Sequence, residues 1–160
     1  MKTAICVLCD RATVREGLLH ILGAGIATLG RPSLPGPMEV DLALLLRPSE
    51  IGEITGSHEV SVCVRSDDGT IAAQSKLGFA ITPLEPTPDP LPSLPFSVGL
   101  RNVVLTAYGH YTVQVDYDGG RLEEIRFSVE KQLTVGVTPG VETPSSQPDP
   151  EATDMPSRSN

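Results

Sequence analysis

The sequence contains no tryptophan and only three phenylalanines and three tyrosines among its 160 residues, so its core must be mainly aliphatic. Basic residues are also few, with twelve Lys and Arg against twenty Asp and Glu and a net charge of −8. Nucleic acids and anionic membranes attract clustered Lys and Arg. The nearest approach to a cluster is the pair Arg11 and Arg15. We therefore expect neither nucleic acid nor a membrane as a partner.

Cysteine is scarce as well, and three cysteines do not build a secreted disulfide framework. Cys6 and Cys9 have the spacing of a redox motif or half a zinc site. Residues three apart on a strand point to opposite faces, so we interpret both as ordinary strand cysteines. The apolar run at residues 3–9 ends too early for a secretory signal, and no stretch approaches the roughly 20 apolar residues of a membrane-spanning helix. The sequence predicts a cytoplasmic protein with reduced thiols.

Fifteen prolines and fifteen glycines separate short apolar runs, a distribution typical of many turns and few helices. Within the runs, apolar and polar residues alternate with the period of a half-buried strand. The clearest example is the face formed by Met38, Val40, Leu42, Leu44 and Leu46. The pattern predicts an all-β fold, namely an immunoglobulin-like, two-sheet antiparallel sandwich of about eight strands. A partly closed β-barrel is the alternative.

Turn residues set the expected boundaries of the strands. We expect the first strand to end at Asp10, and a turn at residues 14–17 to lead into a second strand, 18–29, that is kinked at its paired glycines. The proline-containing segment 30–37 is expected to cross between the sheets, and residues 48–52 to form one helical turn. The Asp-Asp-Gly sequence at 67–69 predicts a hairpin. Residues 82–95, which contain six prolines, predict a long connection between the sheets.

Residues 105–120 resemble the penultimate strand and hairpin of immunoglobulin and fibronectin-type sandwiches. In such folds a tyrosine bonds its hydroxyl group to nearby backbone, and we expect Tyr108 or Tyr111 to do so. After residue 131 the sequence turns to Thr, Pro, Ser and Asp. We therefore place a β-sandwich domain at residues 1–135 and a disordered, acidic, Pro/Ser-rich tail at residues 136–160.

The order of these motifs resembles an uncharacterised bacterial family of β-sandwich proteins of unknown function. The motifs that carry the resemblance are Cys9-Asp10, residues 16–25, the loop 31–35, residues 67–69 and residues 108–111. The resemblance implies a fold, and it implies no activity and no catalytic residue.

Groups that could carry catalysis are few. His20 lies in an apolar segment, where a hydrogen-bonded core or sheet-face histidine is expected, His58 begins a strand and His110 lies in a turn. Cys63 could be paired with His58, but no further group completes a nucleophilic site. We therefore expect a protein that is not an enzyme and that carries no cofactor.

Four aspartates, Asp67, Asp68, Asp116 and Asp118, lie at expected hairpin ends, where sandwich domains can gather carboxylates around calcium. Tight turns need the same residues without a metal, and we favour that interpretation. What remains is a non-catalytic protein-binding or structural module that contacts another protein through loops or an exposed strand edge. Calcium binding is the alternative, followed by a small enzyme.

A specific form of the binding hypothesis places the loop 82–95 and the acidic tail at one end of the domain, where together they recruit a partner. The sequence does not specify whether the chain also forms a homo-oligomer.

Overall fold

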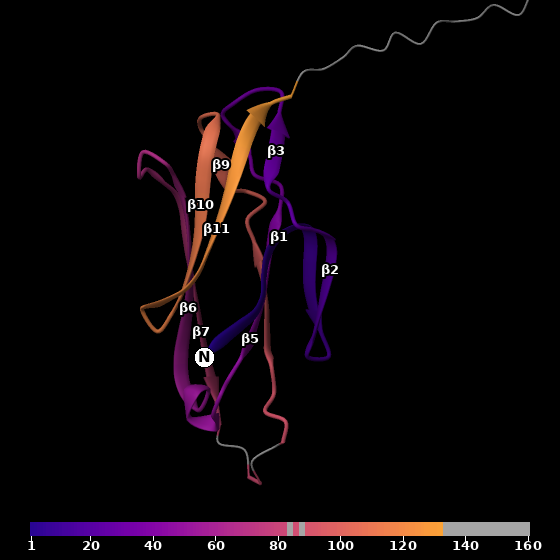
Figure 1. The fold of residues 1–160 in the computed structure, drawn as a ribbon, viewed down its shortest axis with the longest axis vertical. Helices are drawn as coiled ribbons and strands as arrows, with labels where there is room; N and C mark the ends of the chain where they lie inside the picture. Colours follow the sequence, from indigo (N-terminus) through magenta and orange to yellow (C-terminus); the bar gives the residue numbers. More distant parts are fainter. Residues whose placement is uncertain (83–84, 87–88, 133–160) are drawn as a thin grey trace, which may run out of the picture.

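A computed structural model of the chain describes residues 1–82, 85–86 and 89–132. These residues are almost entirely β-structure, with one 3-10 turn, η1 (Ile51–Glu53), at the position where the sequence predicts a helical turn. Figure 1 shows the arrangement of the strands. The strands are β1 (Lys2–Arg15), β2 (Leu18–Ala24), β3 (Thr28–Arg31), β4 (Gly36–Pro37), β5 (Asp41–Arg47), β6 (Gly56–Ser66), β7 (Ile71–Ile81), β8 (Leu94–Gly99), β9 (Val104–Leu105), β10 (Gly109–Tyr117) and β11 (Gly120–Lys131).

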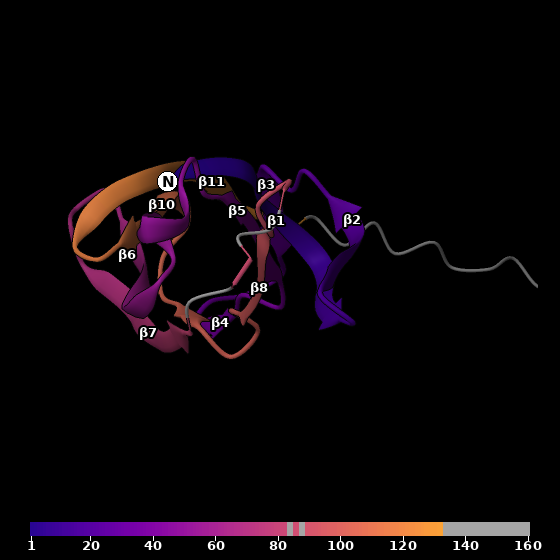
Figure 2. The ribbon, with the colours of Figure 1, turned by 90° about the horizontal axis from the view of Figure 1, so that it is seen from below.

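Two main sheets face each other across the core (Figure 2). One has the strand order β2-β1-β5-β8, and the other, which is curled, has the order β3-β11-β10-β6-β7. Strands β4 and β9 form a small additional pair. Pairing is antiparallel except between β3 and β11, which run parallel. The order β1-β5-β8 opposite β11-β10-β6-β7 follows an immunoglobulin-like sandwich, extended by the β1–β2 hairpin. The predicted all-β fold is confirmed.

Alternating side chains of β5, β6 and β10 build the main core. The predicted inward face of residues 38–46 is fully buried, and it meets the valines of β6 and the aromatic and aliphatic residues of β10. Burial of a large aliphatic side chain contributes about 1.5–3 kcal/mol. The residues that meet in this way are Met38, Val40, Leu42, Leu44, Leu46, Val60, Val62, Val64, Tyr111, Val113 and Val115.

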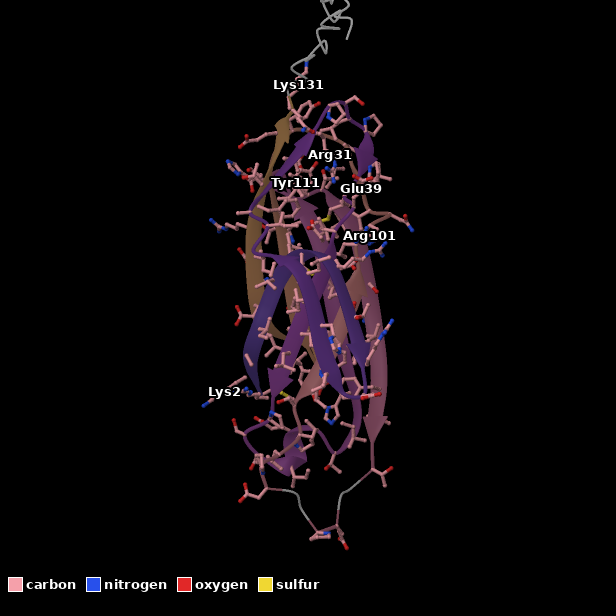
Figure 3. All side chains as sticks on the ribbon, turned by 90° about the vertical axis from the view of Figure 1, so that its right-hand side faces the viewer. Lys2, Arg31, Glu39, Arg101, Tyr111 and Lys131 are labelled. Atoms are coloured by element: carbon pink, nitrogen blue, oxygen red, sulfur yellow. The ribbon has the colours of Figure 1, made fainter. Side chains whose placement is uncertain are left out.

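Tyr111 fixes the corner that leads into β10. Its hydroxyl group donates a hydrogen bond to the carbonyl of Ala107 at 3.0 Å and accepts one from the Ala107 amide at 3.2 Å. Its ring stacks on Phe127, with the ring centroids 5.6 Å apart. Tyr108, the other candidate, bonds instead to the carbonyl of Arg31 at 3.3 Å. Tyr111, labelled in Figure 3, is therefore the corner tyrosine.

The first strand was predicted to end at Asp10, but it continues to Arg15. It pairs with β5 up to Cys9, and from Cys9 onward it pairs with β2. The turn predicted at residues 14–17 is present but shorter: Val14 and Arg15 belong to β1, and Glu16 and Gly17 form the turn with positive φ, 51° and 74°, as a two-residue hairpin turn requires. Asp10 remains in the strand because it lies where the pairing passes from one neighbour to the other.

The predicted second strand, 18–29, is two strands that belong to different sheets. Strand β2 pairs with β1, and β3 pairs with β11. The change occurs at Gly23 and Gly25, whose φ angles are 65° and 92°. At Gly23 a Cβ atom would lie 2.1 Å from Oδ2 of Asp10, so any other residue would displace the Asp10 side chain and would also have to adopt a positive φ, which favours glycine. The glycines therefore break the strand rather than kink it.

The connection after β7 and the end of β11 lie at opposite ends of the sandwich (Figure 1). Ile81 at the end of β7 pairs with Gly56, beside η1, whereas Val129 near the end of β11 pairs with Gly109. The described residues that precede loop 82–95 and those that precede the predicted tail therefore lie at opposite ends of the sandwich. The predicted tail, residues 136–160, and the boundary at residue 135 lie outside the described residues.

Candidate functional site

The four aspartates considered for calcium lie in two separate pairs. Ser66, which precedes Asp67 and Asp68, pairs with Tyr111 near the start of β10, whereas Asp116 and Asp118 lie at the end of β10. The length of β10 separates the pairs, so they do not form one site. Across residues 1–82, 85–86 and 89–132, no group of three or more His, Cys, Asp or Glu side chains is arranged to hold a metal ion.

Three of these aspartates accept hydrogen bonds from residues of their own turn, their own strand or a neighbouring strand. Asp68 accepts from the Thr70 amide at 2.8 Å and from the Ser66 hydroxyl group at 2.5 Å. The Ser66 and Thr70 bonds hold the pKa of Asp68 below its usual value. Asp116 accepts from the Gln114 side-chain amide at 2.8 and 2.9 Å. These hydrogen bonds explain the positions of the Asp68 and Asp116 carboxylates without a bound metal.

Asp118 ties the β10–β11 turn to β6. Its carboxylate accepts from the Glu59 amide and from Nδ1 of His58, both at 2.8 Å. The hydrogen bond from His58, followed by that from Glu59, holds the pKa of Asp118 below its usual value. The other ring nitrogen of His58 lies 3.2 Å from the carbonyl of Thr55. Both nitrogens of His58 are thus used in holding turns together.

Aromatic rings cover His58 on the core side. Its ring stacks on Tyr117 at a centroid distance of 5.3 Å and lies 5.7 Å from Phe79. The Tyr117 hydroxyl group donates to the carbonyl of Glu53 at 2.7 Å. Burial, with smaller effects from the charges of Asp118 and Glu53, raises the pKa of Tyr117 to about 12. Tyr117 therefore stays protonated at neutral pH. The group is a packed structural cluster.

Cys6 and Cys9 point to opposite sides of the sheet, as the strand interpretation predicts. Cys6 packs against the main core, and Cys9 lies in a second small cluster with Ala12 and Ala43. Burial, assisted by the charge of Glu123, raises the pKa of the Cys6 thiol to about 12. Burial, followed by the charges of Asp41 and Asp10, also raises the pKa of Cys9. Both thiols are held in the unreactive, protonated form.

Asp41 is the residue that sequence reasoning missed. It lies on the outer face of β5 and is only 4% exposed. Its Oδ1 lies 3.1 Å from Nε of Arg101, and its Oδ2 accepts a hydrogen bond from the Ala12 amide at 3.0 Å. The signal in the sequence is a carboxylate flanked by Val40 and Leu42 in an otherwise apolar run, a position that is buried only when the charge is paired.

This carboxylate anchors the β1–β2 hairpin to the sandwich. Ser97 on β8 donates to the carbonyl of Ala12 at 2.7 Å, so both main-chain groups of Ala12 are held by side chains of the sheet. Arg101 also donates to the carbonyl of Asp10. The second apolar cluster, formed by Cys9, Ala12 and Ala43 with Val7, Leu19 and Ile21, fills the space beneath. The hairpin is therefore a fixed part of the fold.

The outward face of the hairpin exposes large apolar side chains. Leu18 is 62% exposed and Leu22 is 67% exposed. His20 lies between the two leucines and is exposed too, so of the two predicted alternatives it is a sheet-face histidine and not a core histidine. The hairpin stands out from the side of the sandwich in Figure 2, where β2 faces away from the rest of the molecule.

Strand β2 is also the least protected edge of the two main sheets. The edge strand β8 contains Pro95, which lacks an amide donor, and the edge strand β7 contains Lys76, paired with Glu59 at 2.8 Å. The edge strand β3 has four residues. Proline, lysine and shortness are the usual protections against a further strand. The sequence of β2, Leu-Leu-His-Ile-Leu-Gly-Ala, contains no proline, lysine or acidic residue.

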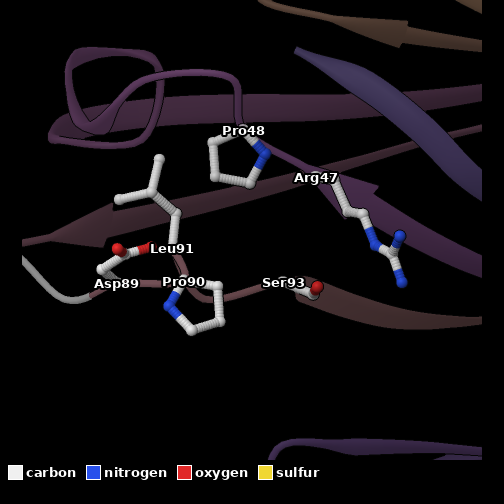
Figure 4. Close-up of a pocket in the computed structure, with 6 residues that line it drawn as sticks. All are labelled: Arg47, Pro48, Asp89, Pro90, Leu91 and Ser93. Atoms are coloured by element: carbon white, nitrogen blue, oxygen red, sulfur yellow. The ribbon is translucent and has the colours of Figure 1, made fainter.

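Two cavities lie at opposite ends of the sandwich. Figure 4 shows one of about 500 Å³ at the end that carries η1, lined by Arg47, Pro48, Asp89, Pro90, Leu91 and Ser93. Another, of about 310 Å³, lies between the β6–β7 turn and the residues that precede β10, and it includes Asp67, Asp68, Tyr108 and His110. Neither set of lining residues contains a cysteine, and the first contains no histidine.

Within the described part of the chain, no helix has the length and apolar character needed to cross a membrane. A search of curated proteins finds no match to the chain. A family model described as a family of unknown function, DUF6941, matches residues 4–130. This match spans both main sheets and confirms the predicted resemblance to an uncharacterised family. The chain therefore belongs to the family of unknown function DUF6941.

Proposed function

We propose that the chain is a non-catalytic protein-binding module and that the β1–β2 hairpin is its binding element. The observation that carries this proposal is the unprotected edge of β2, which combines two leucines exposed by more than 60% with the absence of any proline or charged residue. An extended segment of another protein can pair with such an edge through main-chain hydrogen bonds and gain specificity from alternate side chains.

The main-chain groups of alternate residues of β2 point outward. Ala12 bonds to the side chains of Asp41 and Ser97 and not to β2, so it forms a non-hydrogen-bonded pair with Ile21 across the hairpin. Ile21, and by the same alternation Leu19, therefore direct their N–H and C=O groups away from β1. Two residues thus supply four main-chain groups for an incoming strand.

The anchoring of the hairpin supports a role in binding. Asp41, Ser97 and Arg101 hold β1 against the sheet, and Leu19 and Ile21 pack on the second cluster. A surface that is already ordered loses little conformational entropy when a partner binds, which leaves more of the contact free energy for affinity.

The titratable groups favour binding over catalysis. His58 is committed to Asp118 and covered by aromatic rings, and the pKa values of the Cys6 and Cys9 thiols are raised. The proposal places the module in the cytoplasm, where three free thiols remain reduced. Calcium binding receives no support from the two separated pairs of aspartates.

Affinity capture from the native host tests this function. The wild-type chain is compared with the double variant Leu18→Asp/Leu22→Asp and with Ile71→Asp, which changes a 59% exposed residue on the competing edge, β7. We expect wild type and Ile71→Asp to retain the same bound proteins and the double variant to lose them. Retention of those proteins by all three chains would show that the hairpin is not the binding element.

A further inference from the structure

We propose that the β2 edge binds a second copy of this chain, with the two β2 strands antiparallel about a two-fold axis at His20. The proposal rests on the binding role of the hairpin and names the partner. The contact would join the β2-β1-β5-β8 sheets of the two copies into one continuous sheet of eight strands. A two-fold contact of this kind uses the same surface patch on both copies, so the patch must be complementary to itself.

The sequence of β2 has this self-complementarity. With the axis at His20, Leu18 lies opposite the partner's Leu22, and Leu19 lies opposite the partner's Ile21. The only polar pair is His20 with the partner's His20. Leu18 and Leu22 are on the exposed face, whereas Leu19 and Ile21 are half-buried on the other face. Apolar cross-strand pairs would therefore form on both faces of the junction.

The hydrogen-bonding pattern allows this register. The two-residue turn at Glu16 and Gly17 makes Arg15 and Leu18 a hydrogen-bonded pair, so Leu18, His20 and Leu22 bond to β1. Leu19 and Ile21 present their main-chain groups to the edge. In the proposed register Leu19 exchanges both bonds with the partner's Ile21. His20 falls at a non-hydrogen-bonded position, where opposing Cα atoms are about 4.5 Å apart.

Neighbouring registers are poorer. An axis at Ile21 would place His20 opposite the partner's Leu22 and Leu19 opposite the partner's Gly23. An axis at Leu19 would place Leu18 opposite the partner's His20 and Leu22 opposite the partner's Glu16. Each shift replaces apolar pairs by mixed ones, so the pattern of side chains selects the axis at His20.

Charges are compatible with the same register. Arg15 is paired with Leu18 and Arg11 with Leu22, so each arginine lies one strand away from the junction. Arg15 and the partner's Arg11 are separated by three strand spacings, about 14 Å, which exceeds the screening length of about 8 Å at physiological ionic strength. The acidic turn residue Glu16 lies opposite the partner's Ala24, on the side of the partner's Arg11. No like charges therefore lie close together across the junction.

The edge is short, with seven residues in β2. A stable interface buries at least about 1,200 Å² of surface, and smaller ones are weak or transient. We therefore expect a monomer–dimer equilibrium with a dissociation constant in the micromolar range, about 1 μM or weaker.

Sedimentation velocity of the full chain across this concentration range tests the dimer. The wild-type chain and the β7 variant Ile71→Asp should dimerise equally, whereas Leu22→Asp should raise the dissociation constant at least tenfold. Leu22 is 67% exposed, so this substitution leaves the fold intact, as circular dichroism can verify. A wild-type chain that stays monomeric throughout, or a dimer lost in Ile71→Asp and retained in Leu22→Asp, would overturn the proposal.

Disulfide cross-linking tests the register. The variant His20→Cys should form a covalent dimer on oxidation, because a Cα separation of about 4.5 Å suits a disulfide. Leu18→Cys and Leu22→Cys should each remain uncross-linked alone and should cross-link when mixed. Wild type is the matched control, since Cys9 and Cys63 are buried and the pKa of Cys6 is raised to about 12. Equal cross-linking of all single variants would contradict the proposed axis.

The two proposals fail in distinguishable ways. If the wild-type chain is monomeric but the hairpin still captures a different host protein, the dimer is wrong and the binding function stands. If neither a dimer nor a hairpin-dependent partner is found, both are wrong.

Discussion

Arg101 reaches the buried carboxylate of Asp41 on the outer face of β5, with 3.1 Å between Nε and Oδ1. The second oxygen of Asp41 holds the Ala12 amide, so one side chain joins the segment after β8 to the β1–β2 hairpin. Figure 3 labels Arg101 on this side of the molecule. The position of the proposed binding element depends on this ion pair.

Replacing Asp41 should therefore destabilise the fold. Asp41→Ala leaves Arg101 without its partner and the Ala12 amide without an acceptor, and we expect a loss of about 3 kcal/mol in the free energy of unfolding. Asp41→Asn keeps an acceptor oxygen and should cost less. Urea unfolding of the full chain measures both. The control is Glu59→Ala, which removes the exposed pair with Lys76 and should cost at most about 1 kcal/mol. Equal losses for Asp41→Ala and Glu59→Ala would contradict the anchoring role.

The corner tyrosine provides a second stability prediction. Tyr111→Phe removes both hydrogen bonds to Ala107 while leaving the ring packed on Phe127, and we expect it to cost about 1–2 kcal/mol. Tyr108→Phe removes one exposed bond to Arg31 and should change the stability little. Thermal and urea unfolding of the two variants compare them directly. A larger loss of stability for Tyr108→Phe than for Tyr111→Phe would show that Tyr108, and not Tyr111, is the corner tyrosine.

Asp118 should make stability depend on pH in the acid range. The pKa of Asp118 is lowered in the fold from its usual 3.8, so the ionised carboxylate is favoured by folding. Its contribution is complete above about pH 4 and is lost as the pH falls through the lowered pKa of the folded state.

The variant Asp118→Asn removes this titration and tolerates the positive φ of 49°. Urea midpoints measured between about pH 6 and pH 2 should show a gap between wild type and Asp118→Asn that closes toward the acid end. A gap that stays constant with pH would show that ionisation of the Asp118 carboxylate does not cause the loss of stability in acid.

Calcium should leave the melting temperature unchanged. The four aspartates form two pairs at opposite ends of β10, and Asp68, Asp116 and Asp118 already accept hydrogen bonds. A ligand that binds the folded state raises the melting temperature by mass action. A clear rise at millimolar calcium that disappears in Asp67→Asn/Asp68→Asn would restore the calcium hypothesis for that turn.

The alternation of apolar and polar residues was sufficient to predict the inward faces of β5, β6 and β10, because every second residue of a strand with one buried face is apolar. The sequence also limits the candidates for the corner tyrosine to two residues. The reason is similar, because the hydrogen-bond partner of Tyr111 is Ala107, only four residues away. The parallel pairing of β3 with β11 depends on contacts between residues about 100 positions apart, and no local pattern encodes it.

The candidate binding site was harder to predict from sequence. Leu18, Leu19, Ile21 and Leu22 are the composition of a buried strand, yet two of them are exposed. Whether such a strand is covered depends on which strand lies beside it, and β2 is at a sheet edge. Asp41 was overlooked because its partners, Ala12 and Arg101, come from distant segments.

The most direct test of the binding account is photo-crosslinking in living host cells, with a photoreactive amino acid at position 20 on β2 or at position 74 on β7. Both positions are exposed, and each lies on an edge strand. The account predicts a covalent adduct with a protein chain at position 20 and none at position 74. Adducts of equal yield at both positions, or none at position 20, would contradict it.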